Sequence, residues 1–167
     1  MKKYIIILIV SLIISSSCFA QNYLLKNERN LYSFKCLDRN VVSLAIDSNN
    51  EYLVYRLVSN DTIRMEYPKN KKSCWKKMKF SNLESSDQIF KGAKNLSYIS
   101  FWDKGRKYII FRAYSSTDNT FRLDVKVVDL KLGKIINYIG ILETEEGSLD
   151  VFNNSNLLEK DDRLYPK

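Results

Sequence analysis

The sequence predicts an all-β protein: an antiparallel meander of about eight or nine strands forming a sandwich or a flattened barrel, with room for one or two short helices. From Leu31 onward, short runs rich in Val, Ile, Tyr, Phe and Leu alternate with clusters of Asn, Asp, Ser and Gly. Long helical periodicity is absent beyond the first twenty residues, and only two prolines interrupt the chain. Eleven tyrosines and eight phenylalanines supply the bulk of a core.

The first twenty residues have the pattern of a secretory signal peptide. Lys2 and Lys3 precede an apolar run of about eleven residues, which is shorter than the roughly 20 residues that span a bilayer. Small side chains at Cys18 and Ala20 favour cleavage between Ala20 and Gln21. Lipoprotein processing at Cys18 is the alternative; Ser15 is a poor match to the bulky aliphatic residue usual there. We therefore expect a periplasmic or secreted protein.

The remaining chain is long enough for one domain with its own core. We expect a loose N-terminal segment over 21–30, a single β domain over 31–152 and a polar C-terminal tail over 153–167. Residues 82–95 form a long connection with at most one helical turn, and residues 149–152 add a short strand or begin a weak helix. The expected strands cover 31–37, 41–47, 52–58, 62–67, 74–81, 96–102, 107–114, 121–130 and 135–142.

The alternation of side chains along these strands predicts which faces are covered. Phe121 to Val127 alternates apolar and charged residues, as in a strand with one solvated face. By contrast, the runs from Tyr52 to Tyr55 and from Tyr108 to Phe111 are apolar on both faces. We expect these two runs to be covered on both sides or to form the seam between two packed sheets.

Charge and cysteine content limit the possible partners. Lys2 and Lys3 account for two of the eight net positive charges, which leaves +6 after the signal. This charge favours solubility and anionic partners, such as an acidic protein or an anionic envelope surface, but is too low for a dedicated nucleic-acid binder. In an oxidising compartment Cys36 and Cys74 favour a disulfide closing a loop of about 38 residues and stabilising by about 3–4 kcal/mol. Two buried free thiols are the alternative.

The stretch from Pro68 to Phe80 gathers six lysines around a tryptophan. Strand alternation puts Cys74, Lys76, Met78 and Phe80 on one face and leaves Trp75 on the wetter one. An aromatic anchor ringed by cations is typical of interfaces. The alternative is that Trp75 packs inward while the lysines keep a hairpin and an edge strand soluble. The candidate binding face consists of Trp75, Lys69, Lys71, Lys72, Lys76, Lys77 and Lys79.

Several chemistries are disfavoured by residue type and spacing. The chain has no histidine, which removes His-dependent nucleophilic catalysis and imidazole metal sites. Ser73 and Lys76 match a Ser-x-x-Lys pattern, but in an extended segment they would not share a face. The carboxylates Glu143, Glu145, Glu146 and Asp150 fit a solvated loop better than a glycosidase pair, and Asp47 to Glu51 fits an Asn-rich turn better than a calcium loop. We therefore expect no enzyme activity, no metal and no cofactor.

Two blocks carry a family resemblance. Glu51-Tyr-Leu-Val-Tyr-Arg-Leu57 followed by Ile63-Arg-Met-Glu-Tyr-Pro68, and then Asn95-Leu-Ser-Tyr-Ile-Ser-Phe101, resemble small, uncharacterised exported proteins of Gram-negative bacteria. The shared residues are strand and turn residues, so the resemblance implies export and fold but no activity.

These observations favour a non-catalytic periplasmic protein that occludes a protein partner, as envelope inhibitors and immunity proteins do. The alternative is an envelope-associated protein that binds anionic glycan or lipid head groups through the lysines and Trp75. An enzyme that uses carboxylates alone is the least favoured class.

Overall fold

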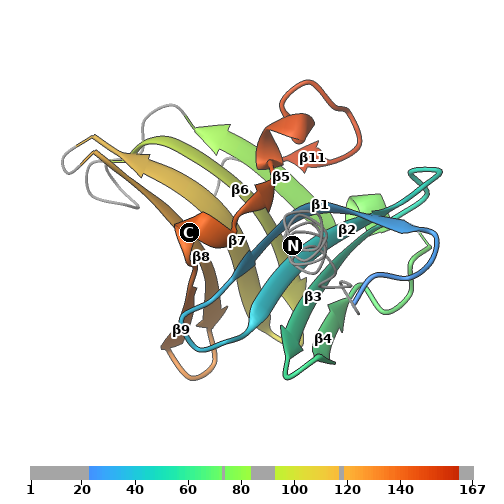
Figure 1. The fold of residues 1–167 in the computed structure, drawn as a ribbon, viewed down its shortest axis with the longest axis horizontal. Helices are drawn as coiled ribbons and strands as arrows, with labels where there is room; N and C mark the ends of the chain where they lie inside the picture. The colour runs from blue at the N-terminus through green and yellow to red at the C-terminus, as the bar shows by residue number, and fades with distance from the viewer. Residues whose placement is uncertain (1–22, 73, 84–92, 117–118, 162–167) are drawn as a thin grey trace, which may run out of the picture.

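The computed structural model describes residues 23–72, 74–83, 93–116 and 119–161, and within them the chain forms two sheets (Figure 1). The expected signal peptide, its Ala20–Gln21 cleavage site, Cys18 and Ser73 lie outside these residues. Together the sheets hold eleven strands, and within the described ranges they are not closed into one barrel. They form a β sandwich, which confirms the predicted fold class and decides between the two predicted architectures.

The first sheet has the strand order β10-β1-β2-β3-β4 and is antiparallel throughout. The hairpin turns between its strands use Arg39, Asn50, Asn60 and Asp61 with positive φ, a conformation that Asn and Asp tolerate better than most residues. Its strands are β1 (Glu28–Lys35), β2 (Val41–Asp47), β3 (Leu53–Ser59), β4 (Thr62–Tyr67) and the two-residue β10 (Glu146–Gly147).

The second sheet has the order β11-β5-β6-β7-β8-β9, and only its β11–β5 pair is parallel. Three single-turn 3₁₀ helices accompany the sheets: η1 (Cys74–Lys76), η2 (Leu142–Thr144) and η3 (Leu149–Phe152). The strands are β5 (Met78–Leu83), β6 (Ala93–Asp103), β7 (Arg106–Ser115), β8 (Thr120–Asp129), β9 (Lys134–Ile139) and β11 (Glu159–Lys160).

Several boundaries differ from the expectations. β5 ends at Leu83 and β6 begins at Ala93, so both ends of the connection expected over 82–95 belong to strands, and residues 84–92 lie outside the described part of the chain. β1 begins at Glu28, inside the segment predicted to be loose, because the Glu28 side chain is held by buried hydrogen bonds described below. Cys74 to Lys76 form a helical turn instead of the start of a strand. Glu159 and Lys160, expected in a polar tail, pair with Lys79 and Phe80 of β5.

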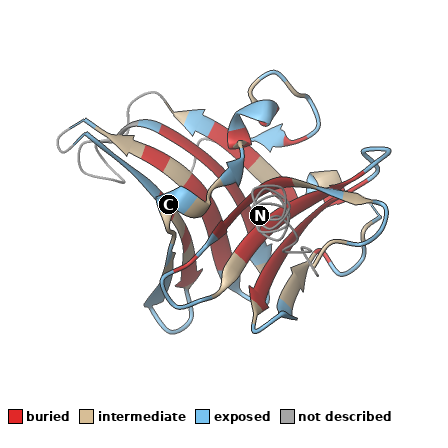
Figure 2. Ribbon diagram, viewed as in Figure 1, coloured by how far each residue is buried: buried red, intermediate tan, exposed pale blue. Residues whose placement is uncertain are grey.

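The main core lies between the two sheets (Figure 2). Tyr67 of β4 stacks on Phe101 of β6 with ring centroids 4.2 Å apart, and Phe101 stacks in turn on Tyr108 of β7 at 4.9 Å. This row of three rings joins the edge strand β4 of the first sheet to β6 and β7 of the second, and large aromatic side chains contribute strongly to such packing.

Both runs predicted to be apolar on two faces are covered on two faces, which confirms the prediction. In β3, Leu53 and Tyr55 face the main core, while Val54 joins a second cluster with Ala45 and Cys74 on the outer face. In β7, Ile110 belongs to the main core, whereas Ile109 and Phe111 join Leu96, Tyr98 and Ala113 on the other side.

The two sheets are also joined at one corner through the backbone. The Leu37 N–H donates to the Ile139 carbonyl at 2.9 Å, and the Ile141 N–H donates to the Lys35 carbonyl at 2.8 Å. Gly140 sits between these bonds, and a Cβ there would lie 2.5 Å from the Leu123 carbonyl oxygen and 2.8 Å from the Phe34 ring. Only glycine lets β9 pass this close to β8 and to the end of β1.

Candidate functional site

The segment that carries the predicted basic face is a turn followed by η1. The Cys74 N–H donates to the Lys71 carbonyl at 3.3 Å, and the Lys77 N–H donates to the Cys74 carbonyl at 2.9 Å. These bonds replace a strand ladder, so the expected strand alternation of side chains applies only from Met78 onward. Met78 and Phe80 are buried in the main core as predicted, whereas Cys74 packs on the opposite, outer face of the first sheet.

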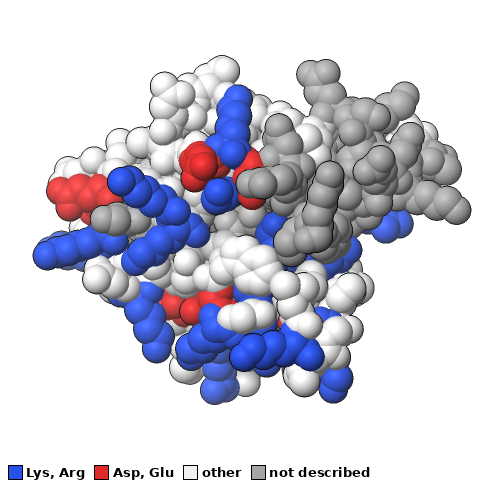
Figure 3. Space-filling view, turned by 180° about the vertical axis from the view of Figure 1, so that it is seen from behind, with Lys and Arg blue, Asp and Glu red and all other residues white. Residues whose placement is uncertain are grey.

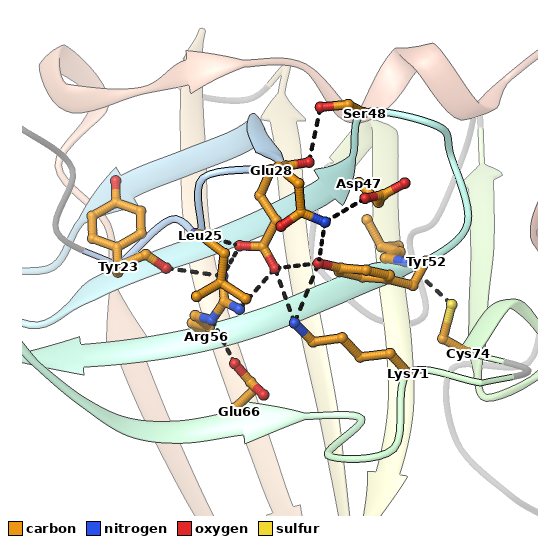
Figure 4. A network of polar contacts seen from close by, with 12 residues as sticks. Tyr23, Leu25, Glu28, Asp47, Ser48, Tyr52, Arg56, Glu66, Lys71 and Cys74 are labelled. Atoms are coloured by element: carbon orange, nitrogen blue, oxygen red, sulfur yellow. Dashed lines mark hydrogen bonds and ion pairs between the residues drawn. The ribbon is translucent and has the colours of Figure 1, made fainter.

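A buried ion pair between Arg56 and Glu28 lies beneath this segment (Figure 4). Both side chains have no exposed surface, and their closest nitrogen and oxygen are 2.5 Å apart. The pair bridges β3 and β1 across the outer face of β2, where Ser43 stands opposite Arg56 and leaves room because its side chain is small. Arg56 is therefore a charged residue that is buried on the outer face of the first sheet, away from the main core.

The Arg56 guanidinium makes further contacts on both sides of this pair. It donates to the Glu66 carboxylate of β4 at 2.7 Å and to the Tyr23 carbonyl at 2.9 Å. The Leu25 N–H also donates to Glu28, at 2.9 Å. The network thus fastens the chain just before β1 against the outer face of the first sheet, because a buried charge needs every available partner.

Lys71 links the basic segment to the same network. Its ammonium donates to Glu28 at 3.1 Å and to the Tyr52 hydroxyl at 3.3 Å, and lies 4.3 Å from the centre of the Tyr52 ring. The Tyr52 hydroxyl in turn donates to Glu28 at 2.9 Å. Of the six lysines in the predicted binding face, Lys71 therefore has a structural role.

The electrostatics follow from these contacts. Burial alone would raise the pKa of Glu28, but hydrogen bonds from Arg56, the Leu25 N–H, Tyr52 and Lys71 outweigh it and lower the pKa to about 2. Burial would lower the pKa of Arg56 and of Lys71, yet the bonds to Glu28 raise both. All three groups are charged at neutral pH.

Trp75 is half-buried and faces the protein with its polar edge. The indole N–H donates to the Glu51 carbonyl at 3.1 Å, and the ring packs against both the main core and the outer cluster around Cys74. Trp75 thus supports the segment from below, as in the inward-packing alternative, while part of its ring stays at the surface.

The remaining lysines divide by their contacts. Lys77 donates to the Asn70 carbonyl at 3.1 Å and Lys79 pairs with Glu159 at 3.4 Å. Lys69, Lys72 and Lys76 are exposed, and their ammonium groups form no hydrogen bond or ion pair with a described residue. We call Lys69, Lys72, Lys76 and Lys77, with the exposed edge of Trp75, the basic surface. Lys and Arg outnumber Asp and Glu over the described part of the face in Figure 3.

The predicted disulfide between Cys36 and Cys74 is wrong, because both cysteines are free and buried. The Cys74 sulfur accepts a hydrogen bond from the Leu53 N–H at 3.2 Å, at the start of β3. Cys36 follows Lys35, which pairs with Val41 and through it with Val58, at the far end of β3. Five residues of strand separate those ends by about 17 Å, beyond the reach of a disulfide.

A pocket of about 580 Å³ opens near that far end of the first sheet. Lys35 and Arg39 line it together with Asp61 and Glu146, so its charges are mixed. Cys36 also lines it, but burial, with smaller effects from Asp38 and Asp124, raises the pKa of its thiol to about 12. The thiol is therefore protonated at neutral pH and a poor nucleophile.

The carboxylates considered as catalytic candidates have structural partners. Glu145 accepts from Arg112 at 3.0 Å, and the Asp150 carboxylate accepts from the Ser148 hydroxyl at 3.1 Å at the start of η3. Asp47 accepts from the Asn49 N–H at 2.8 Å and from the Asn27 amide at 2.7 Å, as a turn-forming aspartate does.

The residues that the structure describes contain no cluster of three or more Cys, Asp and Glu side chains able to hold a metal ion. Nor does the part of the chain that the structure describes include a helix long and apolar enough to cross a membrane.

The protein is a two-sheet β sandwich. Its basic surface lies next to the buried network around the Arg56–Glu28 ion pair. No protein family, curated protein or solved structure matches this chain.

Proposed function

We propose that this chain is an exported, non-catalytic binding protein that occludes an acidic protein partner in the periplasm, as inhibitors and immunity proteins do. The single observation that carries the proposal is the contrast within one short segment. Lys71 is fixed to the buried Glu28 carboxylate, while its neighbours Lys69, Lys72 and Lys76 are exposed and without a partner among the described side chains. Lys71 and the Trp75 N–H fix described residues close to these cations to the body of the protein.

Preorganisation favours a protein partner. Ordering loops and side chains at the moment of binding costs affinity, and a surface already fixed by Lys71 and by the Trp75 N–H avoids part of that cost. The half-exposed ring of Trp75 offers an aromatic contact beside these lysines, and tryptophan is enriched among the residues that contribute most to protein interfaces. The signal-peptide pattern of residues 1–20 and the resemblance to exported Gram-negative proteins support a location in the periplasm.

The alternative is an envelope-associated protein that binds anionic glycan or lipid head groups through the same lysines. Lipid recognition by charge alone uses clusters of about four to eight Lys or Arg, each contributing about 1 kcal/mol. Three exposed lysines without an ionic partner among the described residues are fewer than that, so a shaped acidic protein surface is the better fit.

The test compares two triple variants of equal charge. One replaces Lys69, Lys72 and Lys76 by Gln; the control replaces the exposed Lys26, Lys104 and Lys131 by Gln. Each tagged protein is used for capture from periplasmic extract, and the captured complex is then purified and its stoichiometry measured by light scattering. We expect a one-to-one complex with wild type and control that weakens steeply with salt, and no complex with the basic-surface variant.

Two outcomes contradict the proposal. The absence of any stoichiometric protein partner would exclude occlusion of a protein. Equal loss of binding in both triple variants would show that net charge matters and the basic surface does not. If wild type binds anionic vesicles or glycan and only the basic-surface variant fails to, the envelope-associated alternative replaces the proposal.

A further inference from the structure

The pocket at the far end of the first sheet is a site separate from the basic surface. Its volume of about 580 Å³ lies within the range that small ligands occupy in proteins. The described residues that line it come from β1, from the turns between β1 and β2 and between β3 and β4, and from the chain that enters β10. They include none of the lysines of the basic surface, nor Trp75.

The sheet and the Arg56 network hold the walls of this pocket in place. Val41 and Val58 give it an apolar floor: they pair with each other across β2 and β3, and their strand neighbours face the main core. Tyr23 lines another side, and its carbonyl accepts from Arg56 at 2.9 Å. A pocket whose walls are already fixed costs little ordering when a ligand binds.

Two opposite charges lie on the two turns that border the pocket. Arg39 belongs to the turn between β1 and β2, and Asp61 to the turn between β3 and β4. Both side chains are exposed and form no hydrogen bond or ion pair with a described residue. Lys35 and Glu146 also line the pocket, one of each sign, but both have other contacts in the protein. Arg39 and Asp61 are therefore the charges that a ligand can use.

The spacing of these two charges indicates the length of the ligand. Lys35 pairs with Val41 and Val41 pairs with Val58, so both turns lie at the same end of the first sheet, its lower end in Figure 1. From one hairpin to the next is two strand spacings, about 10 Å. Three residues of extended peptide span about the same distance.

We propose that this pocket binds a short peptide with free ends, about three residues long and with aliphatic side chains. The terminal carboxylate of the peptide pairs with Arg39, its terminal ammonium pairs with Asp61, and its side chains lie on Val41 and Val58. Charge-assisted hydrogen bonds at the two ends fix the orientation, and the apolar floor contributes burial between them.

The groups in the pocket favour a peptide over a ligand with a single charge. A fatty carboxylate pairs with Arg39 but leaves Asp61 without a partner, and an apolar amine does the reverse. The side chain of Asn60, which also lines the pocket, both donates and accepts hydrogen bonds, as a peptide group requires of its partner. A zwitterion with amide groups between its charges uses all three residues.

The test titrates the purified protein with the tripeptide Val-Ala-Val in a calorimeter, and with the same peptide acetylated at its N-terminus or amidated at its C-terminus. We expect the free peptide to bind and each blocked form to bind about tenfold more weakly, because each loses one charge-assisted bond. In Arg39→Gln the free and amidated peptides are expected to bind alike. In Asp61→Asn the free and acetylated peptides are expected to bind alike.

Matched variants control for charge and for the basic surface. Lys104→Gln and Glu51→Gln change exposed charges outside the pocket and are expected to keep the affinity of the wild type. The triple variant of Lys69, Lys72 and Lys76 is expected to keep it as well, so peptide binding and capture of a protein partner succeed or fail separately. Thermal unfolding checks that each variant is folded.

Three results would overturn the proposal. The first is no binding of Val-Ala-Val at about 10 mM peptide. The second is equal affinity for the free and blocked peptides, or binding that neither Arg39→Gln nor Asp61→Asn weakens. The third is tighter binding of octanoate than of the peptide, with a dependence on Arg39 alone, which would make the pocket a site for an apolar anion.

Discussion

Arg56 and Glu28 form an ion pair with no exposed side-chain surface, although they belong to strands separated by β2. The pair joins the chain before β1, the edge strand β4 and the basic segment into one polar network over the outer face of the first sheet.

Removing one partner of the buried pair is expected to be costly. Glu28→Gln keeps the shape of the side chain but leaves the buried Arg56 with only the partly exposed Glu66 as a carboxylate partner, so the free energy of unfolding falls by about 3 kcal/mol. Urea unfolding measures the change. The control is Glu159→Gln, which removes an exposed pair with Lys79 and is expected to cost less than about 1 kcal/mol. Equal effects in the two variants would contradict a structural role for Glu28.

The same carboxylate predicts a dependence of stability on acid. Its pKa is about 2 in the folded protein and about 4.3 when unfolded, so its contribution is complete above pH 4.3 and is lost as pH falls through 2. We expect the wild type to lose on the order of 3 kcal/mol over this range from Glu28 alone. The measurement is urea unfolding from pH 6 to pH 2, with Glu28→Gln beside it. The gap between the two proteins narrows with acid; a constant gap would refute the lowered pKa.

Two adjacent lysines are expected to behave differently. Lys71→Gln loses a charge-assisted bond to Glu28 and the contact with the Tyr52 ring, and destabilises by about 1–2 kcal/mol. Lys72→Gln changes an exposed side chain and shifts stability by less than about 0.5 kcal/mol. Thermal unfolding of the two variants makes the comparison, and indistinguishable midpoints would count against the role assigned to Lys71.

The two cysteines are expected to be protected thiols. In a Cys18→Ser background, native protein reacts slowly with a thiol reagent at neutral pH, because burial raises the pKa of Cys36 and of Cys74. Under denaturing, non-reducing conditions both thiols react. Titration in the two conditions checks this, and an absence of free thiols after unfolding would restore the disulfide that the structure excludes.

The sequence predicts the sheets well because local patterns determine them. The expected ranges 41–47 and 62–67 coincide with β2 and β4, and the other long strands shift by a few residues. β10 and β11 could not be predicted, because two-residue strands have no alternation and depend on partners brought close by the fold. The turn at Cys74 was misjudged because its β-like residues are governed by bonds to Lys71 and Leu53.

The candidate site was only partly predictable. The lysines and Trp75 stand out by composition, but which lysine is bound and which is free depends on Glu28, which lies 43 residues from Lys71 in the chain. One signal was available: Arg56 lies within the apolar run from Leu53 to Val58, in a strand predicted to be covered on both faces. A charge in such a place requires a buried partner.

The pairing of β1 with β10 has a consequence for how the molecule is assembled. Tyr32 pairs with Gly147, and a Cβ at Gly147 would lie 1.9 Å from the Leu31 carbonyl oxygen, so the contact is close and specific. In a chain that emerges from its N-terminus, β1 appears first, and the β10 residues that pair with its edge appear almost last. Until residue 147 has emerged, one edge of β1 is unpaired and can pair with a strand of another chain. A chaperone that binds this edge would therefore prevent aggregation better than one that binds the C-terminal half.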